Sequence, residues 1–290
     1  MAIARNGEIT LWYDDSGAPD APAVVIVPGT GRQATDSDLL RVALVSAGFR
    51  VLQMDNRDAG LSTPLTGMPA NLPALFAAAN GGPPAQPAYD ARDMMRDILA
   101  VMDAAGVARA HLIGRSVGAM AAQSAAIDAT ARVASLVLVM SAARGVAELV
   151  TAERMASLEA EVMLDADGFA ARQLAVARVN AMPQDVEPER IEAEARAAFA
   201  RGVHPGGTAR HYAVALALPD LRPQLSRLAV PTLVIHGAHD RVIPPAFGRE
   251  IAGAVPGAGY LELLDMAHDG SPRVQQLWVQ PILRHLGLAS

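Results

Sequence analysis

Short apolar runs alternate along the chain with segments whose apolar residues recur at helical spacing. The apolar runs are typical of strands buried on both faces of a sheet, and they lie at residues 23–27, 49–54, 110–113, 133–140 and 232–236. Further strands are expected at residues 8–13 and 259–264. Strands that alternate with helices predict an α/β fold, namely a doubly wound, mostly parallel sheet with helices on both faces.

The segment after residue 90 shows the helical pattern most clearly. Asp90 is a typical N-cap residue, and Asp93 in the first turn is favourable to the helix dipole. The apolar stripe that would face the sheet consists of Met94, Met95, Ile98, Val101, Met102 and Ala105. Other helices are expected at residues 37–47, 245–254 and 271–286.

The pattern changes between residues 142 and 219, where the chain is rich in Ala, Arg and Glu, is helical in periodicity and contains no strand-like run. We therefore predict a core formed by residues 1–143 and 220–290, interrupted by a helical cap or lid at residues 144–219. Residues 63–88 are rich in Pro and Gly and are expected to form a long loop, which in a compact domain is usually functional or mobile.

Composition excludes several classes of function. The formal net charge of −6 gives no basic footprint for nucleic acid, and no run approaches a membrane span. Residues 1–8 lack the apolar core of a signal peptide, so a cytoplasmic protein without nucleic-acid or membrane partners is expected. The absence of cysteine excludes disulfides, thiolate metal sites and a cysteine nucleophile, and the absence of lysine excludes a Schiff-base or P-loop lysine.

The candidate chemistry starts at residues 114–118, which read Gly-Arg-Ser-Val-Gly between a predicted strand and an Ala-rich helix. Gly-x-Ser-x-Gly in this context is the pattern of a nucleophile elbow, a strained turn that exposes the serine hydroxyl. The alternative is a glycine-flanked turn with an ordinary serine. The elbow interpretation makes Ser116 the candidate nucleophile.

A serine hydroxyl needs a base within hydrogen-bond reach and a third group to orient that base. Functional residues of a doubly wound sheet collect at the carboxyl ends of its strands, and Asp240 and His268 follow the last two predicted strands. The order Ser116, Asp240, His268 is the order of this elbow class. Asp240 could instead be a turn residue, but the strand at 133–140 ends with no carboxylate before Glu148.

The histidines near Asp240 have a simpler interpretation. His236 and His239 are expected to shape the turn, because their spacing with Asp240 fits no standard zinc motif. No metal and no organic cofactor are therefore predicted.

A competing motif lies near the start of the chain. Residues 29–34 read Gly-x-Gly-x-x-Ala after a strand, and Asp55 ends the next strand, as in a dinucleotide-binding dehydrogenase. The preceding hairpin, Pro28 at the entry to the turn and the lack of a lysine for a reductase dyad argue against this alternative.

Taken together, these motifs resemble those of α/β-hydrolase-fold serine esterases over nearly the whole chain. The matching segments are residues 28–31, 55–62, 114–118 and 236–244, together with His268. The segment Asn-Arg-Asp-x-Gly-x-Ser at 56–62 and the position of the cap resemble the aclacinomycin methylesterase group more narrowly. Arg115 departs from the small or apolar residue common in that group, and Val117 departs from its usual Met.

The resemblance implies a mechanism and a substrate class. His268 would take the proton from Ser116, Asp240 would orient His268, and the backbone amides of Thr30 and Val117 would form the oxyanion hole. The expected partner is a small-molecule carboxylic ester with an apolar moiety. An acyltransferase, a lactonase or a non-catalytic ligand-binding protein would present the same residues.

Arg57 and Arg115 are expected to have different roles. Arg57 and Asp58 are expected to pair and brace the loop after the second parallel strand. Arg115 beside the nucleophile is expected either to bind an anionic group or to be a solvated surface residue.

Overall fold

The fold is built on an eight-stranded sheet of order β1-β2-β4-β3-β5-β6-β7-β8. The computed structural model describes residues 2–151, 165–204 and 206–287. β1 and β2 pair antiparallel, β2 is antiparallel to β4, and all other neighbours are parallel. The strands are β1 (Ala2–Asn6), β2 (Ile9–Ser16), β3 (Ala23–Val27), β4 (Arg50–Met54), β5 (Ala110–Arg115), β6 (Val133–Val139), β7 (Thr232–Gly237) and β8 (Gly259–Leu263). The predicted mostly parallel α/β fold is confirmed.

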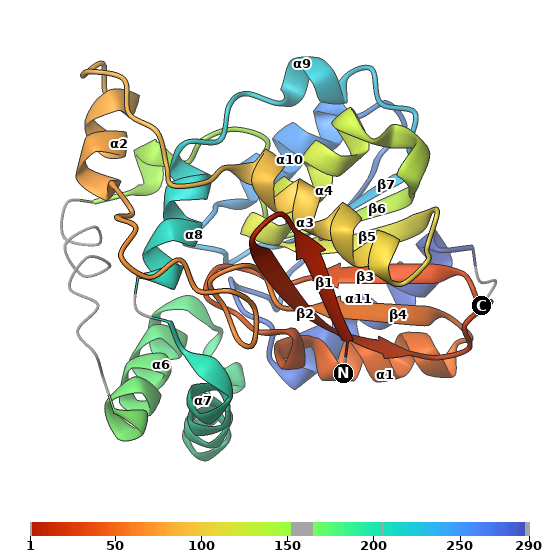
Figure 1. The fold of residues 1–290 in the computed structure, drawn as a ribbon, viewed down its shortest axis with the longest axis horizontal. Helices are drawn as coiled ribbons and strands as arrows, with labels where there is room; N and C mark the ends of the chain where they lie inside the picture. The colour runs from red at the N-terminus through yellow and green to blue at the C-terminus, as the bar shows by residue number, and fades with distance from the viewer. Residues whose placement is uncertain (1, 152–164, 205, 288–290) are drawn as a thin grey trace.

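Helices cover both faces of this sheet (Figure 1). On one face, α1 (Asp38–Ser46) and α11 (Pro272–His285) form an apolar core with the sheet that includes Leu40, Leu44 and Trp278. On the other face lie α3 (Ala91–Ala104), α4 (Val117–Asp128) and α10 (Pro245–Ala254). Asp90 accepts hydrogen bonds from the backbone amides of Arg92 and Asp93, so the predicted N-cap of α3 is confirmed. Short 3-10 turns, η1 (Ala34–Ser37) and η2 (Thr130–Arg132), precede α1 and β6.

The expected loop at residues 63–88 contains a helix, α2 (Leu72–Ala79). The flanking Pro and Gly residues hide an apolar run of good helix formers, and Pro73 lies in the first turn, where its missing amide costs nothing. α2 packs against α8 (Gly207–Leu216). The prediction of one continuous loop was therefore wrong.

Between β6 and β7 the regular elements that the structure describes are all helical, and short irregular segments connect them. The elements are η3 (Ala147–Leu149), α6 (Ala166–Asn180), η4 (Pro183–Asp185), α7 (Pro188–Gly202), α8 and α9 (Arg222–Leu225). α6 and α7 pack against each other, and α8 contacts α4 of the core. The helices α2, α6, α7 and α8 lie beyond the sheet edge where the parallel strands end (Figure 1). The division into a core and a cap stays a prediction, and residues 144–219 are called the predicted cap below.

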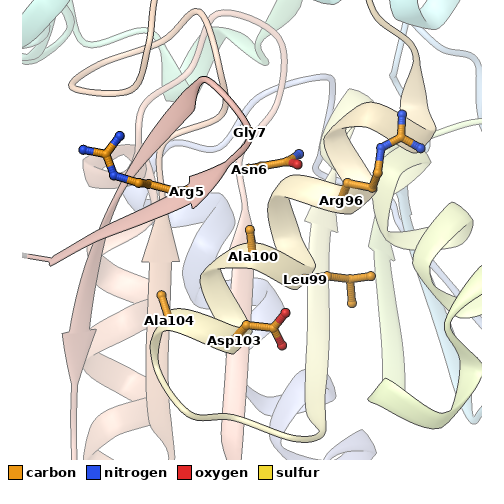
Figure 2. Close-up of a pocket in the computed structure, with 8 residues that line it drawn as sticks. All are labelled: Arg5, Asn6, Gly7, Arg96, Leu99, Ala100, Asp103 and Ala104. Carbon is orange, nitrogen blue, oxygen red and sulfur yellow. The ribbon is translucent and has the colours of Figure 1, made fainter.

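A depression of about 470 Å³ lies between β1, the turn at Gly7 and α3 (Figure 2). Its lining includes Arg5, Arg96 and Asp103 and none of the predicted site residues. No helix within residues 2–151, 165–204 and 206–287 is long and apolar enough to cross a membrane.

Candidate active site

The turn after β5 has the geometry of a nucleophile elbow. Ser116 adopts φ 52° and ψ −120°, a strained conformation for a residue with a side chain, and α4 begins at the next residue. A Cβ on Gly114 would collide with the backbone of Ala119, and a Cβ on Gly118 would collide with the carbonyl of Pro28. Glycine at 114 therefore allows β5 and α4 to pass closely on either side of Ser116, and glycine at 118 allows α4 to pack against the end of β3.

Two hydrogen bonds hold this strained residue in place. The amide of Ser116 donates to the carbonyl of Val139 at 2.9 Å, and the hydroxyl of Ser141 donates to the carbonyl of Ser116 at 2.8 Å. Both partners come from the end of the neighbouring strand β6 or directly after it. The backbone of the elbow is thus fixed by the sheet, while the Ser116 side chain is not involved.

Asp240 and His268 form a hydrogen-bonded pair at the ends of β7 and β8. Nδ1 of His268 lies 2.7 Å from Oδ2 of Asp240, whose side chain is fully buried. Oδ1 of Asp240 accepts from the amides of Val242 and Ile243 at 2.9 and 2.8 Å. Burial raises the pKa of Asp240, but His268 and His236 more than offset this effect and hold the pKa well below its usual range. The ionised carboxylate therefore fixes the proton of His268 on Nδ1 and leaves Nε2 as the basic atom.

A second histidine also contacts the carboxylate. Nε2 of His236 lies 2.8 Å from the carbonyl of Ile243 and 3.2 Å from Oδ2 of Asp240. A Cβ on Gly248 in α10 would collide with the His236 ring, so glycine there makes room for it. His236 thus shapes the turn, as the sequence predicted, and also supports Asp240, which sequence reasoning missed. The spacing of four residues between His236 and Asp240 could have indicated this contact.

Close packing of two loops brings His268 to Asp240. A Cβ on Gly237 would collide with the carbonyl of Met266, so glycine lets the loop after β8 pass directly beside the end of β7. The amide of His239 also donates to the carbonyl of Met266 at 3.0 Å. From the predicted cap, the carbonyl of Asn180 accepts from the amide of His268 at 2.9 Å. The loop that carries His268 is therefore held from both sides.

Asp185 in η4 holds the same loop further along. Its carboxylate accepts from Arg273 at 2.6 Å and from the hydroxyl of Ser271 at 3.0 Å. The side chain of Asp185 is fully buried, whereas Arg273 is partly exposed, and this contact joins the predicted cap to the start of α11.

The structure places Ser116 at the same sheet edge as this pair, because β5, β7 and β8 are parallel and their carboxyl ends lie together. The hydroxyl of Ser116 and Nε2 of His268 make no hydrogen bond to any residue that the structure describes. Hydrogen bonds between a nucleophile and its base often form only when substrate binds. The missing bond therefore does not exclude Ser116 and His268 as such a pair.

The loop after β3 supplies the second predicted oxyanion donor. A Cβ on Gly29 would lie 3.4 Å from the Cβ of Ser116, so this loop runs directly beside the candidate nucleophile. Within the described part of the chain, the amides of Thr30 and Val117 have no hydrogen-bond partner, whereas the amide of Gly31 donates to Nδ1 of His211 at 3.0 Å. The two amides are thus available to an oxygen that develops negative charge at this position.

Comparison with known proteins identifies the family. Residues 22–271, most of the chain, match the alpha/beta hydrolase fold family. The chain belongs to this family. The rhodomycin D methylesterase DnrP of Streptomyces peucetius is 28% identical over 92% of this chain and 91% of its own length.

Two solved structures are similar over nearly the whole of this α/β hydrolase. An enol-lactonase from Burkholderia xenovorans LB400 is 27% identical with a TM-score of 0.77, covering 99% of this chain and 100% of its own. A hydrolase from Pseudomonas aeruginosa PA01 is 27% identical with a TM-score of 0.75, covering 99% of this chain and 98% of its own. The resemblance to esterases of the α/β hydrolase fold is confirmed.

The loop at residues 55–62 of this α/β hydrolase is organised differently from the sequence expectation. Arg57 pairs with Asp97 of α3 at 2.6 Å, and Asp58 pairs with Arg210 of α8 at 2.8 Å. Asp58 adopts a φ of 65°, and the two neighbouring side chains bind partners on different helices. The expected Arg57–Asp58 pair was therefore wrong.

Asp55 does not hold a ribose in this hydrolase. Its carboxylate accepts from the amides of Ala34 and Leu61 at 2.7 and 2.9 Å and pairs with Arg201 of α7 at 2.7 Å. Asp55, the acid that would bind the ribose in a dinucleotide-binding dehydrogenase, thus has its carboxylate bound by groups of the protein itself. Among the described residues no group of three or more His, Asp or Glu side chains is arranged to hold a metal ion.

Proposed function

We propose that this α/β hydrolase cleaves carboxylic esters through an acyl-enzyme intermediate on Ser116. The observation that carries the proposal is the Asp240–His268 hydrogen bond of 2.7 Å at the sheet edge where Ser116 occupies the strained elbow. A buried, ionised carboxylate that fixes the tautomer of a histidine is the arrangement that lets an imidazole act as a general base.

The proposed reaction begins when Oγ of Ser116 attacks the ester carbonyl and Nε2 of His268 takes the hydroxyl proton. The amides of Thr30 and Val117 bind the carbonyl oxygen as it becomes an oxyanion. A single donor of this kind typically lowers the barrier by about 2.7–4 kcal/mol. His268 then gives its proton to the leaving alcohol, and a water activated by the same imidazole hydrolyses the acyl-enzyme. Asp240 stays ionised and stabilises the imidazolium in both steps.

The relatives support an ester bond, open or cyclic. One is named a methylesterase and the other an enol-lactonase, and both names describe cleavage of an ester linkage. A lactone is therefore the second candidate substrate, because the same residues would open it without any change of mechanism. We expect a small molecule with an apolar moiety and no cofactor, bound between the sheet edge and the predicted cap.

Intact mass after treatment with a fluorophosphonate tests the proposed nucleophile. We expect a single adduct on the wild type and on Ser226→Ala, a control at an exposed serine outside the site, and no adduct on Ser116→Ala. An adduct that persists on Ser116→Ala, or a wild type that stays unlabelled, would contradict the proposal. Hydrolysis of short methyl esters by the wild type and its loss in Ser116→Ala would then establish the reaction.

A further inference from the structure

Arg115, directly before the nucleophile, has an unusual environment for an arginine of this protein. It is partly buried, yet its side chain makes no hydrogen bond or ion pair with any residue that the structure describes. The other arginines without a partner in the described part of the chain are all exposed, namely Arg5, Arg178, Arg227, Arg241 and Arg284. Arg115 is therefore not a solvated surface residue of the ordinary kind.

Its guanidinium lies between the two loops that build the reaction centre. A Cβ on Gly29 would lie 3.6 Å from Nε of Arg115, and a Cβ on Gly270 would collide with Nη1. Gly29 precedes the predicted oxyanion donor Thr30, and Gly270 follows two residues after His268. Glycine at position 270 leaves the space that the arginine side chain occupies, and Gly29 lies in ordinary contact with it.

The charges around Arg115 do not satisfy it. Burial is the strongest influence and lowers the pKa of the guanidinium, while Asp36 and Asp269 raise it without reaching contact distance. Asp36 is already bound to the amide of Gln33 at 2.7 Å and to Arg32 at 3.4 Å. Oδ1 of Asp269 accepts from the amide of Ser271 at 2.6 Å, and its Oδ2 is buried without a partner.

The donors of this guanidinium are open to a ligand. It offers five N–H donors in a fixed fork and stays protonated in proteins. None of its nitrogens is among the buried atoms without a partner in the described part of the chain, so these donors reach solvent. A planar carboxylate matches the fork with two parallel hydrogen bonds and one compensating charge.

We propose that Arg115 binds a free carboxylate on the substrate, so that the preferred substrates are esters or lactones that carry a carboxylate near the scissile carbonyl. This inference rests on the proposed ester hydrolysis, because it defines the substrate class of the same site. We expect the carboxylate near the scissile carbonyl because the guanidinium lies between the loop that carries Thr30 and the loop that carries His268.

Matched substrates test the inference. Monomethyl glutarate carries a free carboxylate, and dimethyl glutarate is its neutral counterpart. We expect the wild type to favour the monoester about 10- to 100-fold in kcat/KM, as expected for a charge-assisted hydrogen bond, with the difference mainly in KM. Arg115→Gln should abolish this preference, because it should lower kcat/KM for the monoester far more than for dimethyl glutarate.

Arg32→Gln is the matched control, because it removes the same charge from a nearby exposed side chain. It should keep the preference. The inference is overturned if the wild type shows no preference for the monoester, if Arg115→Gln lowers both substrates equally, or if Arg32→Gln has the same effect as Arg115→Gln. An equal loss on both substrates would instead assign Arg115 a structural role beside Asp269.

Direct binding separates this inference from the proposed function. Calorimetric titration with glutarate needs no turnover and so reports on Arg115 even if Ser116 is not a nucleophile. We expect glutarate to bind the wild type and Arg32→Gln, and to bind Arg115→Gln at least about tenfold more weakly. Equal affinity in all three proteins, or no binding to the wild type, would overturn the inference whether or not esters are cleaved.

Discussion

At the scale of single residues, His211 of α8 connects two loops at the sheet edge. Its Nδ1 accepts from the amide of Gly31 at 3.0 Å, and its Nε2 donates to the carbonyl of Arg57 at 2.7 Å. Both contacts require the neutral ring with its proton on Nε2. Burial also favours this neutral form, because it lowers the pKa of His211. Because Gly31 follows Thr30, His211 orients the loop that presents the proposed oxyanion donor.

Replacing His211 with Asn or Gln separates these two contacts. The amide oxygen of Asn can take the place of Nδ1 toward Gly31, whereas the amide of Gln reaches the place of Nε2 toward Arg57. We expect His211→Asn to keep kcat within about tenfold of the wild type, and His211→Gln to lose about 100-fold, because a displaced oxyanion donor forfeits a large part of its 2.7–4 kcal/mol. Steady-state kinetics on one ester measures both variants, and equal losses would show that the contact with Gly31 does not matter.

The same histidine predicts a dependence of stability on pH. The pKa of His211 in the folded protein lies below its ordinary value of 6.5, so below about pH 6.5 the unfolded chain binds more protons than the folded one. The free energy of unfolding that His211 contributes is therefore complete above this pH and falls as the solution becomes more acidic. Urea unfolding at pH 7.5 and 5.5 should show that the advantage of the wild type over His211→Asn shrinks on acidification. An unchanged difference would mean that His211 does not titrate on unfolding.

At the scale of elements, the loop after β4 anchors the helices of the predicted cap. Asp58 pairs with Arg210 of α8 and Asp55 pairs with Arg201 of α7, and the side chains of both carboxylates are fully buried. Burial raises the pKa of Asp58, but hydrogen bonds from the Arg210 side chain and the Leu65 amide outweigh this effect and hold the pKa below its ordinary value. The carboxylate is therefore ionised at neutral pH. These two pairs attach α7 and α8 to the loop after β4, whereas the sequence predicted that Asp58 pairs with Arg57 inside this loop.

Removing one partner of the Asp58–Arg210 pair should strongly destabilise the protein. Asp58→Asn leaves the buried guanidinium of Arg210 without a counter-charge, and Arg210→Met leaves the buried carboxylate of Asp58 without one. Either variant should lower the free energy of unfolding by about 3–5 kcal/mol. The double variant should be less destabilised than the sum of the two, because it leaves no buried charge. Arg196→Gln is the control, since it breaks an exposed ion pair with Asp167 and should change stability little. Urea unfolding of all four proteins measures this coupling, and strictly additive losses would contradict it.

Local pattern and long-range contact explain which elements the sequence could predict. Buried strands and the amphipathic helix α3 follow from hydrophobic periodicity, and strand-end positions were enough to select Asp240 and His268, which the structure brings into contact. α2 was missed because Pro and Gly on both sides concealed its apolar run. The partners of Arg57 and Asp58 were not predictable, because they lie on helices 40 and 152 positions away along the chain. The partners of His211 lie in two loops that are 154 and 180 positions away.

At the scale of the whole molecule, the helices of the predicted cap are held to the core very unequally. α8 buries most of its length against the core, including Arg210 and His211. In contrast, α6 buries only Ala170 and Leu174, and α7 buries only Ala195. Polar contacts such as those from the Gln33 amide to the carbonyls of Ala198 and Gly202 attach this helix pair to the loop after β3. Apolar burial supplies most of the free energy that resists local opening, so α6 and α7 should open more easily than α8.

Hydrogen exchange followed by mass spectrometry tests this order of opening. Peptides from residues 166–202 should exchange faster than peptides from 207–216, and both faster than peptides from α4, in which Val117, Ala119 and Met120 are fully buried. α10 is the control, because it is also a surface helix but packs directly on β7 and β8. Since the carbonyl of Asn180 at the end of α6 binds the amide of His268, opening of this pair would also loosen the loop of the proposed base. Protection of residues 166–202 equal to that of α10 would instead mean that the helix pair is a fixed wall of the site, and that substrate must enter by another path.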